Sequence, residues 1–190
     1  MERAYIQDKV FEKIHASATG LHLADYESCT FTGVDLSNGD LSGFNFIDCA
    51  FNGCNISIVK LAKTSFRDCR FTECKLVGLL FEDCNQSLLA VEFNKCVLNL
   101  SSFYKVKIRK TKFKNCSLNE VDFTEADVSS SLFENCDLSR AIFKNTQLQK
   151  ADFRTSFNYS IDPSDNPIKK ARFALAGIPG LLDKYDIQIE

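Results

Sequence analysis

Large apolar residues recur at every fifth position along most of this chain, and that period constrains the fold more than any other feature. The series runs unbroken from Leu21 to Phe81 and resumes from Leu88 to Phe153. In most units a small residue, such as Cys29, stands two positions before the large one. Helices repeat every 3.6 residues and strands every two, so neither explains a period of five. The pattern predicts a coil in which each unit forms one side and turns one corner, with the large and small residues inside.

This pattern resembles the pentapeptide-repeat family, whose unit is a small residue, Asp or Asn, Leu or Phe, and two polar residues. The resemblance covers about residues 19–173 and is carried by units such as Ala24-Asp25-Tyr26, Val34-Asp35-Leu36, Val121-Asp122-Phe123, Ala126-Asp127-Val128 and Ala151-Asp152-Phe153. It implies an all-β fold, a right-handed quadrilateral β-helix in which four units make one 20-residue coil. We therefore expect a single domain over residues 1–190.

Stacked coils should place like residues 20 positions apart, and the sequence satisfies this test. The columns include Phe113, Phe133, Phe153 and Phe173, and separately Cys54 and Cys74. Joining the two halves of the chain needs one step of 22, from Phe71 to Phe93 and from Leu76 to Leu98. We therefore predict a two-residue slip between Phe81 and Leu88, within residues 82–87.

The nine cysteines also follow the repeat. An odd number without a signal peptide argues against a disulfide framework. Zinc sites need thiolates that converge on one point, whereas these residues fall into columns, except for Cys84 in the slip. We interpret them as small apolar fillers of the core and expect no metal and no cofactor. No apolar run approaches the roughly 18 residues of a membrane span, so we expect a cytoplasmic protein.

The two ends depart from the repeat. We expect residues 1–18 to cap the first coil, with Phe11 and Ile14 covering it, because open strand edges template aggregation. At the other end, residues 174–190 form a cap or dimerisation segment, with a short helix near 178–185 and Pro179 in its first turn. Apolar residues at helical spacing either pack on the last coil or form a two-fold dimer, and the two roles are compatible. These residues are Ile178, Leu181, Leu182 and Tyr185.

Charge is unevenly distributed, with an excess of acids over residues 24–92 and of bases over 93–154. An array of carboxylates on a straight rod could imitate the phosphates of duplex DNA, although simple solvation also explains it and Arg67 and Arg70 interrupt it. We expect the acids of the first coils to lie on a single side. The candidate partner-binding residues are Asp25, Glu27, Asp48 and Asp68, with Asp83 and Asn85 in the slip.

The basic run from Lys105 to Lys114 suggests a nucleic-acid patch, but the coil geometry argues against one. Lys105, Lys107 and Lys114 stand 20 positions before Glu125, Asp127 and Glu134. Opposite charges on adjacent strands contribute about 0.2–1 kcal/mol each, so we expect these pairs to neutralise part of the run. Arg109, Lys110 and Lys112 have no such partner in the sequence and stay candidates. Direct binding of nucleic acid is therefore not favoured.

Nothing in the sequence indicates an enzyme. The only histidines are His15 and His22, and the chain has no nucleophile elbow, P-loop or dinucleotide fingerprint. Carboxylates that precede the large inward residues point outward, so they cannot converge on a substrate.

Within the family, the chain is most similar to the Qnr-type quinolone-resistance and gyrase-poison immunity group. The similarity rests on units such as Phe46-Ile47-Asp48-Cys49-Ala50-Phe51, on the mid-chain slip, and on the ending Asn158-Tyr159-Ser160-Ile161-Asp162-Pro163 with Leu181-Leu182. It implies a homodimeric rod that mimics DNA, binds DNA gyrase or topoisomerase IV, and protects the enzyme from quinolones or toxins or inhibits it. The alternative is a general protein-interaction or structural rod without a topoisomerase role. A continuous acidic surface would favour the first hypothesis and a mixed surface the second.

Overall fold

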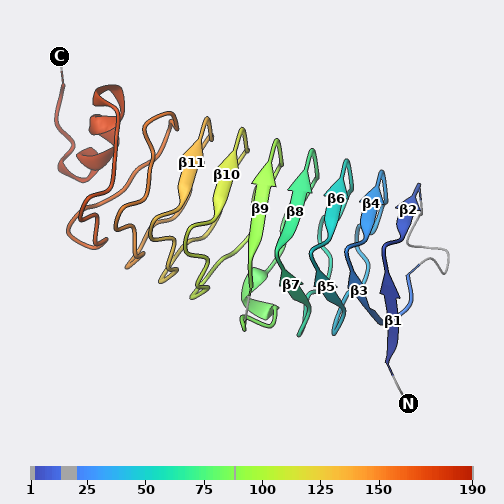
Figure 1. Ribbon diagram of the computed structural model, residues 1–190. Coiled ribbons are helices and arrows are strands. Elements are labelled where there is room, and N and C mark those ends of the chain that lie inside the picture. Colours follow the sequence, from blue (N-terminus) through green and yellow to red (C-terminus); the bar gives the residue numbers. More distant parts are fainter. Residues whose placement is uncertain (1–2, 14–20, 88, 190) are drawn as a thin grey trace.

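The computed structural model describes residues 3–13, 21–87 and 89–189, and the chain winds into a rod of stacked coils (Figure 1). Two parallel sheets run along the rod. The first face contains β1 (Ala4–Gln7), β3 (Ala24–Glu27), β5 (Asn45–Ile47) and β7 (Ser65–Arg67). The second face contains β2 (Val10–Glu12), β4 (Thr30–Thr32), β6 (Ala50–Asn52), β8 (Cys69–Thr72), β9 (Val91–Asn94), β10 (Lys112–Lys114) and β11 (Leu132–Glu134).

Single parallel bridges complete the other two faces. The third face carries a ladder from Asp35 through Asn55 to Lys75 and onward to Phe157, and the fourth carries Asp40 with Lys60 and then Leu80 through to Ile142. Partners stand 20 residues apart on every face, except at one step of 22. The predicted all-β, four-sided solenoid is therefore confirmed. Among the described helices, none is long and apolar enough to cross a membrane.

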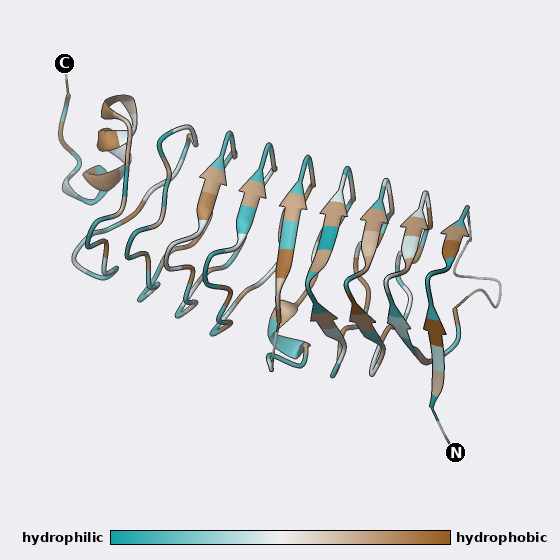
Figure 2. Cartoon of the chain, in the orientation of Figure 1, coloured by the Kyte–Doolittle hydropathy of each residue, from teal (hydrophilic) through white to brown (hydrophobic). Residues whose placement is uncertain are grey.

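Stacked phenylalanine rings fill the core, because every coil places its large inward residues above those of the previous coil. Ring centroids lie 5.2 Å apart between Phe93 and Phe113, 4.9 Å between Phe113 and Phe133, and 4.5 Å between Phe133 and Phe153. A second column meets the first edge-on, with Phe123 at 6.1 Å from Phe113. Such pairs add about 0.5–1.5 kcal/mol beyond their buried area. Figure 2 shows brown, apolar segments that recur at a similar level of successive strands of the second face.

The small inward position also joins neighbouring coils by hydrogen bonds. The Cys54 thiol donates to the carbonyl oxygen of Phe31 at 3.4 Å, and the Cys74 thiol to that of Phe51 at 3.3 Å. Hydroxyls make the same contact elsewhere, such as Thr146 Oγ1 to the Phe123 oxygen at 2.8 Å. All nine cysteines are free and buried. The interpretation of the cysteines as core fillers thus extends to Cys84, the residue outside the columns.

The two-residue slip is present, and the strands on either side of it pair in the predicted register. Phe71 pairs with Phe93, which is a step of 22. A 3₁₀ helix, η1 (Phe81–Asp83), precedes it, and Asn85 still donates to Thr64 in the ordinary register. The extra residues are accommodated between Asn85 and Val91, which overlaps the predicted window of 82–87 and extends beyond it. Leu88, expected to resume the inward series, lies outside the described residues.

The N-terminal segment differs from the expected cap in its structure. β1 pairs with β3 and β2 with β4 in the 20-residue register, so residues 4–12 form two sides of a further coil. Phe11 stacks on Phe31 with ring centroids 4.9 Å apart. The repeat therefore begins ahead of residue 19, because Ile6 and Phe11 already occupy inward positions. Ile14 lies outside the described residues.

At the far end of the rod from β1 and β2, two 3₁₀ helices close the chain (Figure 1). They are η2 (Leu175–Leu181) and η3 (Asp183–Tyr185). The short C-terminal helix is thus confirmed, but it begins before the predicted residue 178. Pro179 consequently lies inside η2 rather than in the first turn of the helix.

Candidate partner-binding surfaces

Asp25 and Glu27 lie on β3, the second strand of the first face, and both carboxylates accept hydrogen bonds. Asp25 forms an ion pair with Arg3 and accepts a hydrogen bond from Asn45 Nδ2 at 2.7 Å. Glu27 accepts a hydrogen bond from the Tyr5 hydroxyl at 2.6 Å. The same hydrogen bond is the main cause that raises the pKa of Tyr5 above its usual value. The negative charge at this end is therefore partly neutralised within the chain.

Asp48 and Asp68 occupy the corner after the first face rather than the face itself. Both have a left-handed backbone, with φ of 48° and 53°. Asp48 forms an ion pair with Arg70 at 3.0 Å. The four acids belong to units that stack on the same side, but the two pairs stand at different positions of the five-residue unit. Asp25 and Glu27 lie on the face, whereas Asp48 and Asp68 lie at its corner.

The two slip residues, Asp83 and Asn85, behave differently from each other. Asp83 is exposed at the end of η1, and its backbone oxygen accepts from the Lys63 amide at 2.8 Å. Asn85 Nδ2 donates to Ser65 Oγ at 3.3 Å, and its Oδ1 accepts from the Ser87 amide at 3.2 Å. Asn85 thus ties the slip to β7, while the Asp83 carboxylate faces solvent.

Beside the slip, the rod surface contains a hollow of about 210 Å³. Its lining mixes both signs of charge, with Asp68 and Glu92 next to Arg70, Arg109 and Lys110. Among the described residues, no group of three or more His, Cys, Asp or Glu side chains could hold a metal ion. The hollow therefore presents a mixed polar surface rather than a metal site.

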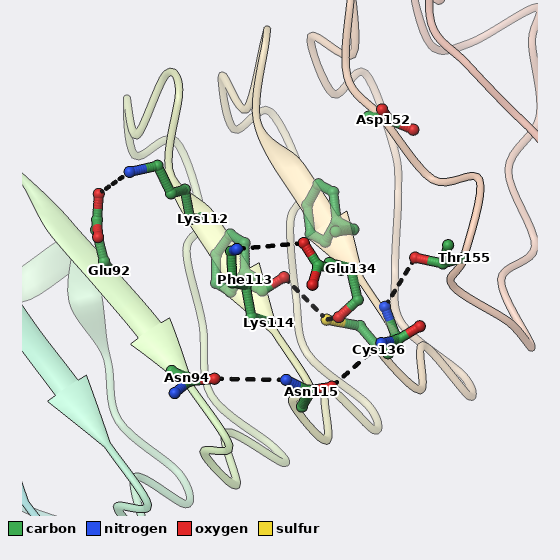
Figure 3. Close-up of polar contacts among 12 residues, drawn as sticks. Glu92, Asn94, Lys112, Phe113, Lys114, Asn115, Glu134, Cys136, Asp152 and Thr155 are labelled. Carbon is green, nitrogen blue, oxygen red and sulfur yellow. Dashed lines mark hydrogen bonds and ion pairs between the residues drawn. The ribbon is translucent and has the colours of Figure 1, made fainter.

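The basic run is neutralised more completely than the sequence suggests. Lys105 reaches Glu125 at 3.6 Å and Lys114 reaches Glu134 at 3.3 Å, as predicted. Figure 3 shows Lys114 beside Glu134, and Lys112 beside Glu92 one coil earlier, at 2.7 Å. The expectation that Lys112 has no partner is wrong, because its acid stands 20 residues before it rather than after it.

Asp127 pairs with a different base from the one predicted. Its backbone bridges Lys107, but its carboxylate forms an ion pair with Arg109 at 2.6 Å. Arg109 therefore also has a partner, contrary to the expectation. Burial favours the neutral acid, but hydrogen bonds from Ser129 and Arg109 outweigh it and lower the pKa of Asp127. Of the three candidates, Lys110 alone shows no ion pair within the described part of the chain.

The C-terminal segment sits on the last coil through a close glycine contact. A Cβ on Gly177 would lie 1.8 Å from the Tyr159 hydroxyl oxygen, and one on Gly180 would lie 2.1 Å from the Tyr159 carbonyl oxygen. The Ile161 amide donates to the Gly180 oxygen at 2.8 Å. Only glycine permits this approach, so these two residues fix where η2 lies.

The four residues predicted for a dimer interface divide between two environments. Leu181 packs against the core, and Leu182 is half-buried. Ile178 and Tyr185 are exposed, by 36% and 59%. Leu175 is 88% exposed, and the sequence reading missed it because it precedes the predicted helix. An apolar surface thus remains open at this end of the rod, with Ile187 and Ile189 beside it.

A second apolar surface was not recognised from the sequence. Ile58, Leu80 and Leu100 lie about the corner between the third and fourth faces, and they are 62%, 47% and 58% exposed. Ile58 and Leu100 have φ of 57° and 61°, a conformation that is unfavourable for a β-branched residue such as Ile58. The sequence does contain a sign of this surface, because these apolar residues stand at outward positions where other units carry polar ones.

All nine thiols are buried and none is exposed at the surface. Burial raises the pKa of Cys49 to about 11 and that of Cys84 to about 12. Since the thiolate is the nucleophile, these residues are inert at neutral pH. The described surfaces carry ion pairs and exposed apolar side chains.

Comparison with known proteins points to the same architecture. The family model for the pentapeptide repeat region matches residues 24–89 and 86–157. No curated protein sequence matches the chain at a significant level. Two structures of QnrB1, a plasmid-mediated fluoroquinolone resistance protein, superpose with TM-scores of 0.65 and 0.64 at 16% and 15% identity. The first match covers 99% of this chain and 98% of the other, and the second covers 100% of both.

A third similar structure is HetL, a pentapeptide repeat protein involved in heterocyst differentiation regulation from the cyanobacterium Nostoc. Its TM-score is 0.45 at 14% identity, and the match covers 90% of this chain and 87% of the other. At 16% and 15% identity, the likeness to the two QnrB1 structures concerns the fold alone.

Proposed function

We propose that this chain, which belongs to the pentapeptide repeat family, is a non-enzymatic protein that acts by binding another protein along its outer surface. The observation that carries the proposal is the filled interior. Stacked rings such as Phe113 and Phe133 occupy the core, and the small positions beside them are buried cysteines, serines and threonines. Functional contacts are therefore made by the outward residues of each unit.

The first target to test is a type II topoisomerase, DNA gyrase or topoisomerase IV. The support is the full-length likeness of the rod to QnrB1, a fluoroquinolone resistance protein, together with the Qnr-like sequence of repeats and C-terminal segment. In this role the rod protects the enzyme from quinolones or toxins, or inhibits it. The exposed Leu175 and Ile178 would join two rods into a homodimer.

The second candidate is an interaction rod without a topoisomerase role, and the surface charges favour it. Acidic and basic side chains are interspersed along the second face and its edges, in ion pairs such as Arg70 with Asp48 and Lys112 with Glu92. DNA presents an unbroken row of phosphates, whereas this surface mixes the two signs. A topoisomerase that binds this rod would therefore recognise more than negative charge.

Supercoiling by the cognate gyrase, with and without ciprofloxacin, tests the first candidate. Titration of the purified protein should restore supercoiling in the presence of the drug, or inhibit the drug-free reaction. A Leu175→Arg/Ile178→Arg variant should weaken the effect if the dimer is the active form. These exposed residues are a better choice than Leu181→Arg, because Leu181 packs against the core. No effect of micromolar protein on gyrase supercoiling would count against gyrase as the target and favour the second candidate.

A further inference from the structure

One corner of the rod, the one that follows the first face, carries a row of residues in which charge changes sign once. We call this row the ridge. Its members stand 20 residues apart, or 22 across the slip, where Cys69 pairs with Val91. Successive ridge residues are therefore one strand spacing, about 4.8 Å, apart. The ridge consists of Asp8, Ser28, Asp48, Asp68, Ala90, Lys110, Ser130, Lys150 and Lys170.

The ridge is acidic on one side of Ala90 and basic on the other. Its charged members are all exposed, and each has a positive φ, from 48° at Asp48 to 63° at Lys110, so they project from the same turn of their coils. Asp48 forms an ion pair with Arg70. Across the part of the chain that the structure describes, no ion pair satisfies the other charged members, which are Asp8, Asp68, Lys110, Lys150 and Lys170.

This order of charges is complementary to itself when one copy is reversed. A two-fold axis at Ala90 places residues that are equally distant from Ala90 opposite each other. One coil away, Asp68 meets the Lys110 position, and four coils away, Asp8 meets the Lys170 position. The intervening matches are Asp48 with Ser130 and Ser28 with Lys150. No two like charges meet, and the acid already paired within its own chain, Asp48, meets a neutral residue.

We propose that the ridge is a self-association surface on which a second copy of this chain lies antiparallel. Parallel docking would place acids against acids and lysines against lysines, so charge alone selects the antiparallel arrangement. Two bases beside Lys110 are neutralised within the chain, Lys112 by Glu92 and Arg109 by Asp127. This contact is separate from the C-terminal apolar surface and does not depend on a topoisomerase role.

Because exposed ion pairs are weak and screened by salt, the association is a low-affinity, salt-dependent one. Sedimentation velocity of the full chain at about 20 mM and about 500 mM salt measures it. The weight-average mass should rise at low salt. The C-terminal contact is apolar and responds little to salt, so the salt-dependent part of the mass reports on the ridge.

Exchanging the charges of Asp68 and Lys110 tests whether the molecule that binds the ridge is a second copy of this chain. Asp68→Lys reverses one contact on each side of the axis and should weaken the salt-dependent association about tenfold or more. Lys110→Asp should do the same, and the double variant Asp68→Lys/Lys110→Asp should restore it. Lysine is tolerated at such corners, as at Lys63 and Lys105, which also have positive φ. The matched controls Asp83→Lys and Lys63→Asp change the net charge equally on another corner and should leave the association unchanged.

Two results would overturn the proposal. One is a mass that does not depend on salt in the unsubstituted protein. The other is a double variant that stays as weak as the single ones, since a different binding partner would not be rescued by exchanging charges within this chain.

Discussion

At the scale of single residues, the small inward position combines two functions. It fills the space between large residues, and its thiol or hydroxyl donates to a carbonyl of the preceding coil, as Cys74 does to Phe51 and Ser156 to Phe133. A buried carbonyl without a donor is costly. The occurrence of cysteine, serine and threonine at equivalent positions therefore reflects hydrogen bonding as well as size.

Burial of the thiols leads to a prediction about their reactivity. The pKa of Cys49 is raised to about 11 by burial, so the reactive thiolate is scarce at mildly alkaline pH. We expect an aromatic disulfide reagent to modify the native protein very slowly, and all nine cysteines at once after unfolding in guanidinium. Rapid modification of several thiols in the folded protein would contradict the buried columns.

A truncation tests the phenylalanine columns. Phe113 is fully buried between Phe93 and Phe133, so Phe113→Ala should lower the free energy of unfolding by about 3–5 kcal/mol. Phe157 is 50% exposed, and Phe157→Ala serves as the matched control with an effect within about 0.5 kcal/mol. Denaturant unfolding of both variants provides the measurement, and equal effects would show that Phe113 does not face the core. Phe113→Asp should prevent folding altogether.

Sequence spacing predicted the inward residues and two of the ion pairs between coils, Lys105 with Glu125 and Lys114 with Glu134, because these follow directly from the 20-residue register. The partner of Asp127 could not be obtained this way. Lys107 has the right spacing, because its backbone bridges that of Asp127. The carboxylate is instead reached by the longer side chain of Arg109, two residues after Lys107 in the chain. Spacing fixes which backbones are adjacent, whereas side-chain length and direction decide which charges meet.

At the scale of elements, the C-terminal segment depends on two glycines above Tyr159. Gly177→Ala would force a Cβ into the Tyr159 hydroxyl, whose oxygen is buried. We expect η2 to leave the last coil and the melting temperature to fall by several degrees, in keeping with a loss of about 1–3 kcal/mol from overpacking. Ala176→Ser, one residue earlier at an exposed position, is the control. Unchanged melting of Gly177→Ala would contradict the close packing.

The same segment should be sensitive to acid. Lys184 donates to Asp162 at 2.6 Å and lowers the pKa of that carboxyl to about 2, from 3.8. A carboxyl whose pKa is depressed in the folded state stabilises it above the unfolded pKa, and this contribution disappears as the pH falls through the folded value. We expect the protection of amides in residues 175–185 against exchange, relative to the unfolded chain, to fall between about pH 4 and pH 2. In Lys184→Met this pH dependence should be reduced, because only the hydrogen bonds from Ser164 then lower the pKa of Asp162; an unchanged dependence would show that another group is responsible.

The elements at the two ends were the least predictable from sequence. The five-residue signal fades before Leu21, yet β1 and β2 pair in register because Ile6 and Phe11 suffice to place a coil. At the other end, helical spacing predicted a helix near 178–185, whereas close contact of Gly177 and Gly180 with Tyr159 sets the observed start at Leu175. Contacts of this kind join residues distant in the chain, and no local pattern reveals them.

At the scale of the whole molecule, each coil packs only on its neighbours, so the rod is a linear array whose long faces are available for contacts. Its surface combines paired charges, the ridge, and two apolar regions around Leu100 and Leu175. Such a surface suits recognition of a protein with mixed chemistry better than imitation of DNA. The sequence indicated the acidic and basic halves, but only the structure showed how far they neutralise themselves.

Equilibrium binding to purified type II topoisomerases tests the central claim most directly, because it asks whether the outer surface of the folded rod recognises a protein at all. Immobilised gyrase and topoisomerase IV would be titrated with the unsubstituted protein, and with Phe113→Asp as the unfolded control. The account predicts saturable binding at micromolar concentrations or below by the folded protein, and none by the control. Binding by neither enzyme, together with no protein captured from a cognate lysate by the folded rod, would contradict it.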